Sequence, residues 1–186
     1  MGVAIAQKRW TLRELHSLPD DGNKYELVRG DLFVTPPPTN EHETIVALLT
    51  RMLDPFVQRN GLGLIYRPKA VFRYRGSEVE PDLMVRGRAP EPIGNDWASA
   101  PTPVLVVEVI SPSTWRRDRD TKRDFYVSSG IPEYWFVDPD ARSITRVRPG
   151  EEDVTTHDRL VWAPTACTEE LSIDVAHLFA ESGRPN

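Results

Sequence analysis

The chain has 186 residues, of which 39% are hydrophobic and 27% charged, so we expect one globular domain over 1–186 with a substantial core. The formal net charge of −5 excludes a polycation that binds nucleic acid by its overall charge, and any such contact would need a local basic patch or a metal ion. The single Cys167 excludes an internal disulfide and a Cys-rich zinc site, and the lack of a signal-peptide pattern or a long apolar run indicates a cytoplasmic protein.

A short helix and a hairpin are predicted near the N-terminus. A capping box at Thr11 begins the helix, which we expect to end near Leu18. Tyr25–Val28 and Asp31–Val34 flank an Arg-Gly turn and indicate an antiparallel hairpin. Glu26 faces away from its two neighbours in the first strand. It is either a solvated strand residue, which the residue type favours, or an acid that faces a cleft.

The best helical pattern in the chain follows a run of three prolines. Asn40 begins it with a second capping box, apolar residues recur at helical spacing as far as Phe56, and Gly61 caps its end. Pro55 is expected to kink or shorten this helix. His42 lies in the first turn, where the helix dipole disfavours a charged imidazole, so a surface or capping role is favoured over catalysis.

Short strands are predicted in the middle of the chain. Leu62–Tyr66 and Ala70–Tyr74 come first, and Leu83–Val85 follows a proline that cannot donate to a sheet ladder. Asp82 therefore stands at the mouth of the third strand. The connection Arg86–Pro103 is longer than most, which suggests a flap, a lid or a partner contact.

A buried strand with an acid inside it forms the centre of the sequence. Val104–Val109 is rich in β-branched residues and predicts a strand buried on both faces. Glu108 interrupts it, and a carboxylate there is costly unless a metal, a lysine or an arginine meets it. The charged helix Trp115–Ser129 comes next.

The C-terminal third predicts further strands and a final helix. Tyr134–Val137 is a buried strand, and Ser143–Arg148 pairs back beside it as an outer strand. Leu160–Ala163 indicates an edge strand, and Ile173–Phe179 a terminal helix.

Two acids and a lysine are the candidates for chemistry. If their strands pair, Asp82 and Glu108 converge on one hard cation such as Mg²⁺ or Mn²⁺, one of whose waters can act as a nucleophile. Lys122, and less strongly Arg123, would stabilise charge that develops on a phosphate. A structural alternative stays open, in which Lys122 forms an exposed ion pair with Asp118 and Glu108 pairs with a buried arginine.

Several segments resemble a known nuclease family. Pro81-Asp82 followed by Glu108 is similar to the PD-(D/E)XK nuclease signature. The wider set resembles the Uma2 family of restriction-endonuclease-like proteins, over about 10–179, and consists of Tyr25–Gly30, the proline run, His42, Glu108–Thr114, Asp118, Lys122, Tyr126 and Gly130–Trp135.

The resemblance implies an α/β fold, a mixed sheet flanked by helices, as a restriction-endonuclease-like core with an N-terminal helix and hairpin. It also implies a metal held by Asp82 and Glu108, with Glu26 as an additional acid. The superfamily usually carries a lysine two residues after the second acid, and this chain has Ile110 there. Lys122 stands where Uma2-like sequences carry the displaced lysine.

We therefore hypothesise a Mg²⁺- or Mn²⁺-dependent endonuclease that hydrolyses DNA and acts as a homodimer. One alternative is a nuclease-like scaffold without turnover that binds nucleic acid or a protein partner, and another is a hydrolase for a small phosphorylated substrate. In the nuclease, phosphate contacts would come from the basic residues Arg116, Arg117, Arg119, Arg123, Arg67 and Lys69.

Overall fold

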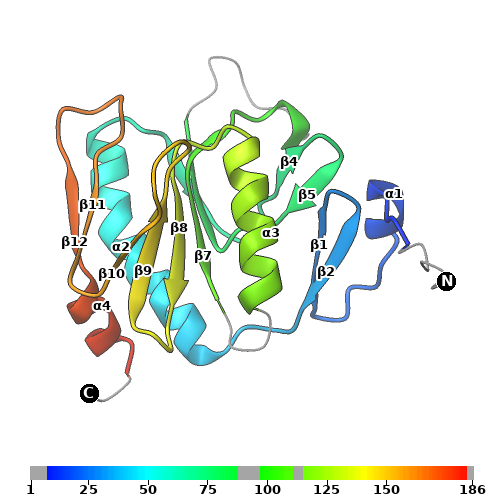
Figure 1. Ribbon diagram of the computed structural model, residues 1–186, viewed down its shortest axis with the longest axis horizontal. Helices are drawn as coiled ribbons and strands as arrows, with labels where there is room; N and C mark the ends of the chain where they lie inside the picture. The colour runs from blue at the N-terminus through cyan, green and yellow to red at the C-terminus, as the bar shows by residue number, and fades with distance from the viewer. Residues whose placement is uncertain (1–7, 88–96, 111–114, 184–186) are drawn as a thin grey trace, which may run out of the picture.

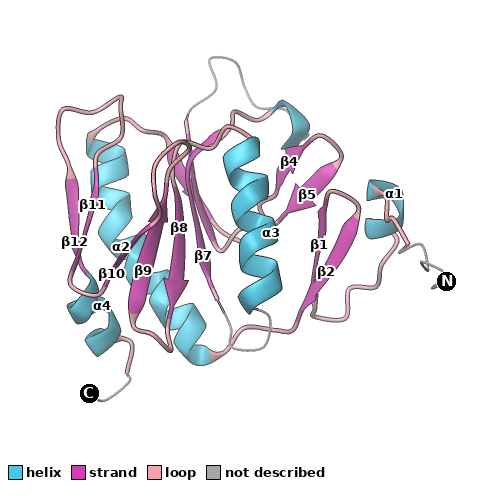
Figure 2. Ribbon diagram, in the orientation of Figure 1, coloured by secondary structure: helices cyan, strands magenta, loops and turns pink. Residues whose placement is uncertain are grey.

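A six-stranded mixed sheet forms the centre of the molecule (Figures 1 and 2). The computed structural model describes residues 8–87, 97–110 and 115–183, with only the backbone of 115–119. β7 (Pro103–Val109) and β8 (Tyr134–Asp138) are parallel, and every other neighbouring pair in this sheet is antiparallel. In sheet order the strands are β10 (Val154–Thr156), β9 (Ser143–Val147), β8 (Tyr134–Asp138), β7 (Pro103–Val109), β6 (Leu83–Arg86) and β3 (Leu64–Tyr66). The mixed α/β architecture is confirmed.

Two helices cover opposite faces of this sheet (Figure 1). Along β6 and β7 the side chains alternate, so Leu83 and Val107 pack with α2 (Asn40–Arg59) while Met84 and Val106 pack with α3 (Trp115–Ser128). The expected burial of the central strand on both faces is confirmed. By the same alternation, an acid at the position after Val107 or before Leu83 lies on the side of α3.

A second sheet holds the N-terminal hairpin. Its order is β2 (Asp31–Thr35), β1 (Lys24–Val28), β5 (Ser77–Val79) and β4 (Phe72–Tyr74). The turn residues Arg29 and Gly30 have φ of 50° and 86°, the left-handed pair that a two-residue hairpin requires, so the hairpin prediction is confirmed.

The expected extents of two helices were partly wrong. α1 (Leu12–Leu15) has the predicted capping box but ends before Leu18, because the backbone N–H groups of Ser17 and Leu18 donate to carbonyls three residues back instead of four. The N-cap of α2 is Thr39, whose side chain accepts from the backbone N–H of His42, and not Asn40.

Pro55 does not shorten α2. The helix runs through it to Arg59, because Leu53, Phe56 and Val57 on either side are buried in the core, and that burial outweighs the lost hydrogen bond. Gly61, at φ 64°, follows the helix end as expected.

The C-terminal region departs further from expectation. β11 (Arg159–Trp162) is no edge of the main sheet, because it pairs with the unpredicted strand β12 (Leu171–Asp174) in a separate two-stranded sheet. The last helix, α4 (Val175–Glu181), begins after Asp174, whose side chain caps it. β10 was also unpredicted. Within the described residues, no helix has both the length and the apolarity that crossing a membrane requires.

The long connection after β6 is described only at its ends. Residues 88–96 lie outside the described residues, and with them half of the expected flap. The short 3₁₀ helix η1 (Trp97–Ser99) returns the chain to the core, where Trp97 packs edge-on against Tyr66 at 5.8 Å between ring centroids.

Glu133 is a buried acid with a structural role. It is 3% exposed and accepts hydrogen bonds from Trp135 Nε1 at 2.6 Å and from Arg148 Nε at 2.7 Å. Both carboxylate oxygens are therefore used to fix the start of β8 in the core.

Candidate active site

Asp82 and Glu108 lie side by side on neighbouring strands. Leu83 of β6 pairs with Val107 of β7, so one step along the antiparallel ladder places Asp82 opposite Glu108, on the same face. The backbone N–H of Val109 donates to Asp82 Oδ2 at 2.8 Å, and the two acids are 4% and 5% exposed. The structure thus brings together the two acids that the sequence singled out.

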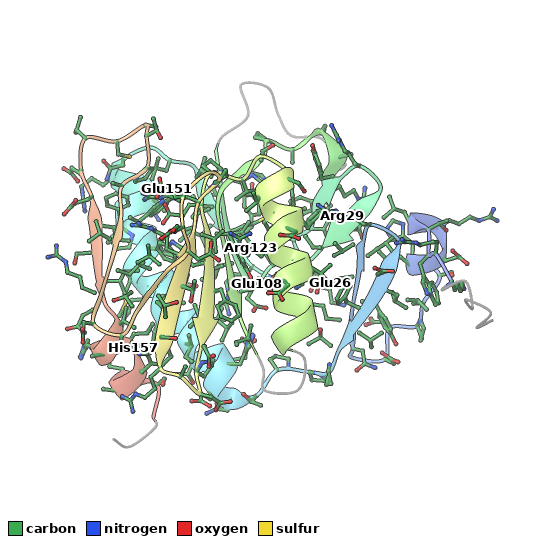
Figure 3. The ribbon with its side chains drawn as sticks, in the orientation of Figure 1. Glu26, Arg29, Glu108, Arg123, Glu151 and His157 are labelled. Atoms are coloured by element: carbon green, nitrogen blue, oxygen red, sulfur yellow. The ribbon has the colours of Figure 1, made fainter. Side chains whose placement is uncertain are left out.

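Lys122 reaches this pair from α3. Its Nζ lies 2.8 Å from Glu108 Oε1 and 2.7 Å from Glu26 Oε2 (Figure 3 shows both acids beside α3). Burial works to lower the pKa of Lys122, but the charges of Glu108 and Glu26 outweigh it and raise that pKa. Tyr126, one helical turn further on, donates its hydroxyl to Glu108 Oε1 at 2.6 Å. Lys122 is buried, so the exposed position that the structural alternative gave it was wrong.

Glu26 is not solvated, contrary to the favoured expectation. It is 1% exposed, and its Oε1 accepts from the backbone N–H of Glu80 at 2.8 Å. The hairpin packs its β1 against α3, so the face that a lone hairpin would expose to water is covered here. Burial alone would raise the pKa of Glu26, but Lys122 and Lys24 outweigh it and hold that pKa below its ordinary value.

Lys24 is a site residue that the sequence reasoning missed. Its Nζ lies 3.1 Å from Asp82 Oδ1 and donates to the carbonyl of Glu80, also at 3.1 Å. Burial opposes its charge, but the carboxylates of Asp82, Glu26 and Glu108 raise its pKa well above the ordinary value. A signal was present, because Lys24 stands two residues before Glu26 and so shares its strand face.

His42 also belongs to the site, and the surface or capping role favoured for it was wrong. Its Nε2 lies 3.1 Å from Asp82 Oδ2, and its side chain is 16% exposed. Burial works to lower the pKa of His42, but the hydrogen bond and charge of Asp82 raise it. In turn Lys24 and His42 hold the pKa of Asp82 well below its usual range against the effect of burial.

These groups form one charged cluster, which we call the acid–lysine cluster and define as Lys24, Glu26, Asp82, Glu108 and Lys122. Its three carboxylates face two ammonium groups, so the cluster keeps an excess of negative charge. Burial raises the pKa of Glu108 even though Lys122 opposes that shift.

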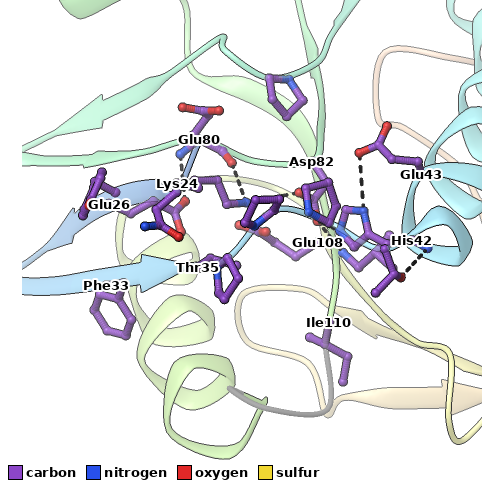
Figure 4. Close-up of a pocket in the computed structure, with 18 of the residues that line it drawn as sticks. Lys24, Glu26, Phe33, Thr35, His42, Glu43, Glu80, Asp82, Glu108 and Ile110 are labelled. Atoms are coloured by element: carbon purple, nitrogen blue, oxygen red, sulfur yellow. Dashed lines mark hydrogen bonds and ion pairs between the residues drawn. The ribbon is translucent and has the colours of Figure 1, made fainter. Parts of the chain in front are cut away.

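The acid–lysine cluster opens into a cavity of about 690 Å³ (Figure 4). All five cluster residues line it, together with apolar side chains such as Phe33 and Ile110. A second cavity of about 400 Å³ shares His42, Glu43, Pro68 and Asp82 with the first and adds Val46 and Arg67. Asp82 therefore lines both cavities.

The basic residues expected to contact phosphate are placed unequally. Lys69 lines the first cavity and Arg67 the second. Arg123 lines neither, because its guanidinium makes two bonds of 2.7 Å to Asp153. The side chains of Arg116, Arg117 and Arg119 lie outside the described residues.

Comparison with known proteins identifies first the fold and then the family. A solved structure from Anabaena variabilis, titled a putative nuclease belonging to DUF820, matches this fold with a TM-score of 0.78 at 20% sequence identity, over 93% of this chain and 99% of that one. The model of the Uma2 family, described as putative restriction endonuclease, matches residues 12–176. The chain belongs to the Uma2 family, and the resemblance seen in the sequence is confirmed. No curated protein sequence matches the chain.

Proposed function

We propose that this protein is a divalent-metal-dependent endonuclease that hydrolyses DNA. The observation that supports this most is the cross-strand pair Asp82 and Glu108, buried on one sheet face beside two lysines. Membership of the Uma2 family supports this reaction class, and the cluster offers the groups that the reaction needs.

The donor set fits a hard divalent ion. Carboxylate oxygens are the protein ligands that Mg²⁺ and Mn²⁺ prefer, and Mg²⁺ commonly uses only one or two of them together with waters and substrate phosphates. No group of three or more His, Cys, Asp or Glu is arranged as a metal site in the part of the chain that the structure describes. A site built on Asp82 and Glu108 alone needs no such group.

Each residue of the cluster has a role in this proposal. Asp82 and Glu108 would hold the ion, which when bound would polarise the scissile phosphate and lower the pKa of water at the site. Lys122 would stabilise negative charge as it develops on the phosphate, acting from a buried position where such a contact is strong. Lys24 fixes Asp82, and Glu26 holds the ammonium of Lys122 in place.

The test is cleavage by matched variants. Wild-type protein with Mn²⁺ or Mg²⁺ is expected to nick supercoiled, linear or single-stranded DNA and to stop on chelation. Asp82→Asn, Glu108→Gln and Lys122→Met should each lose at least about a hundredfold in rate. Glu169→Gln, an exposed acid paired with Arg59, is the control and should cut normally. Cleavage that survives Glu108→Gln would overturn the assigned site.

A second readout separates metal binding from turnover. Mn²⁺ should raise the melting temperature of the wild type, because an ion that binds only the folded state stabilises it. Asp82→Asn and Glu108→Gln should reduce that shift.

Two observations favour a non-catalytic scaffold as the second candidate. The carboxylates of Asp82 and Glu108 already have partners from the protein, and Ile110 stands where the superfamily carries its lysine. A scaffold of this kind would bind DNA without cutting it in any metal. The variants above distinguish the two, because only the nuclease loses an activity with them.

A further inference from the structure

The depth of the acid–lysine cluster limits what can reach it. Glu26, Asp82 and Glu108 are between 1% and 5% exposed and lie in the floor of the 690 Å³ cavity. Cavities of about 300–1,000 Å³ enclose small molecules. A phosphate on the outside of a continuous duplex has its nucleotide stacked and paired, and that nucleotide must leave the stack before it can enter such a cavity.

Part of the lining of this cavity is apolar, beside further charged residues such as Glu41, Glu80 and Lys69. Phe33 of β2, Ile110 and the prolines at 36–38 line it, and Figure 4 shows Phe33 and Ile110 at the periphery of the charged groups. Bases bind aromatic and apolar surfaces by stacking, whatever their sequence. The cavity therefore offers apolar surface to a base and the ammonium groups of Lys24 and Lys122 to a phosphate.

The second cavity extends the path beyond Asp82. It shares Asp82 and His42 with the first cavity, so a chain could lie across both. On its far side, Arg67 pairs with Glu43 at 3.4 Å, and the two side chains are 46% and 51% exposed. An ion pair this exposed is weak, so the guanidinium can exchange Glu43 for a phosphate at little cost.

We propose that the substrate is DNA whose scissile nucleotide is unpaired, and this inference rests on the proposed nuclease function. The unpaired nucleotide occupies the first cavity with its base against Phe33, and its phosphodiester lies over Asp82. Arg67 holds a neighbouring phosphate in the second cavity. A polynucleotide strand is favoured over a free nucleotide because Arg67, in the second cavity, can hold a further phosphate beside the one over Asp82.

The first experiment compares one sequence in three forms. Single-stranded DNA, the full duplex and a duplex with a short unpaired bubble are incubated with wild-type protein and Mn²⁺. We expect the single strand and the bubble to be cut at least about tenfold faster than the full duplex, because pairing and stacking must be broken in the latter. Bubble cleavage should fall at the unpaired positions. Equal rates on all three forms would overturn the inference while leaving the nuclease function in place.

Binding tests the inference even if no substrate is cut, a result that would count against the proposed function alone. Fluorescence anisotropy with labelled DNA in the presence of a chelator should show tighter binding of the single strand than of the duplex. Phe33→Leu keeps an apolar side chain but loses the ring, and should weaken single-strand binding at least about fivefold. Val34→Leu, at an exposed position that lines neither cavity, should bind normally.

Arg67 is tested through salt dependence. Arg67→Gln should reduce the slope of log K against log salt for the single strand by about 0.7, the value for one lost phosphate contact. Arg59→Gln removes an exposed arginine of the same kind, paired with Glu169 at 3.2 Å, and should leave the slope unchanged. An unchanged slope for Arg67→Gln, or tighter binding of duplex by the wild type, contradicts the proposed path.

Discussion

Replacing Lys122 by methionine removes the ammonium group that contacts both Glu26 and Glu108, while keeping most of the apolar stem. The two acids are 1% and 5% exposed, so neither can recover its lost partner from water. Breaking a buried pair from one side costs about 3–5 kcal/mol. The free energy of unfolding of a whole domain is about 5–15 kcal/mol, so this loss is a large part of it. We expect Lys122→Met to lower the free energy of unfolding in urea by this amount at pH 7.5.

The loss should depend on pH in a defined direction. In the wild type the folded-state pKa of Glu26 is lowered, so its contribution is present above its unfolded pKa of about 4.3 and is lost as the pH falls. In Lys122→Met, one of the two positive charges that oppose the effect of burial is removed, so burial raises the pKa of Glu26. A carboxyl group then takes up a proton as the pH falls towards 5, which relieves the buried charge. The difference in stability between the two proteins should therefore narrow from pH 7.5 to pH 5.

Urea denaturation at the two pH values measures this difference, and Arg51→Met provides the control. Arg51 is 64% exposed on its side chain and pairs with Glu181 at 2.6 Å. Exposed pairs contribute about 0–1 kcal/mol, so this variant should lose little at either pH. A loss for Lys122→Met that is no larger than this, or that does not change with pH, would refute the buried network.

Three further outcomes are expected. The pKa of His42 should lie above its ordinary value of about 6.5. The stability that its pair with Asp82 contributes is therefore complete below about pH 6.5 and is lost as the pH rises through the folded-state pKa. NMR titration measures this pKa, and Asp82→Asn should bring it to about 6.5 or lower. Gly63→Ala places a Cβ 2.1 Å from a carbonyl oxygen of β6. Its loss of unfolding free energy in urea should exceed that of Gly61→Ala, which is about 1–2 kcal/mol, because Gly61 also has a positive φ but its Cβ would meet no atom. Equal losses for the two variants would contradict the clash. Glu133→Gln should lose about 1.5–3 kcal/mol without changing cleavage per folded molecule, and a fall in turnover would place it in the site.

Local sequence signals predicted the elements that carry their own markers. The hairpin around Gly30 and the capping box at Thr11 are set by residues adjacent to them, and both were found. The proximity of Asp82 and Glu108 followed from an assumed pairing of their strands. The strand β12 was missed because its pairing with β11 depends on a partner distant in the chain.

The environment of the site acids depended on contacts that no local pattern contains. Glu26 was expected to be exposed to water. The alternation of side chains along a strand defines two faces, but it does not show that α3 covers the second face. His42 was assigned to a helix terminus, which is true of its backbone, but its ring points to an acid 40 residues away. The spacing of Lys24 from Glu26 places both residues on one face of the strand. This signal was overlooked because a lysine at the start of a strand is ordinarily exposed.

The order in which the chain can assemble follows from where the partners of Asp82 and Glu108 lie in the sequence. Glu108 meets Lys122 only 14 residues on, whereas Asp82 meets His42 and Lys24 at separations of 40 and 58 residues. Loops of these lengths close at increasing entropic cost, so Glu108 can gain its counter-charge early in folding, and Asp82 only once the N-terminal hairpin and α2 have docked. A partly folded chain would hold Asp82 in the sheet with its charge unmatched. Correct docking of the N-terminal segments is thus tied to the neutralisation of one carboxylate, and the same event completes the site.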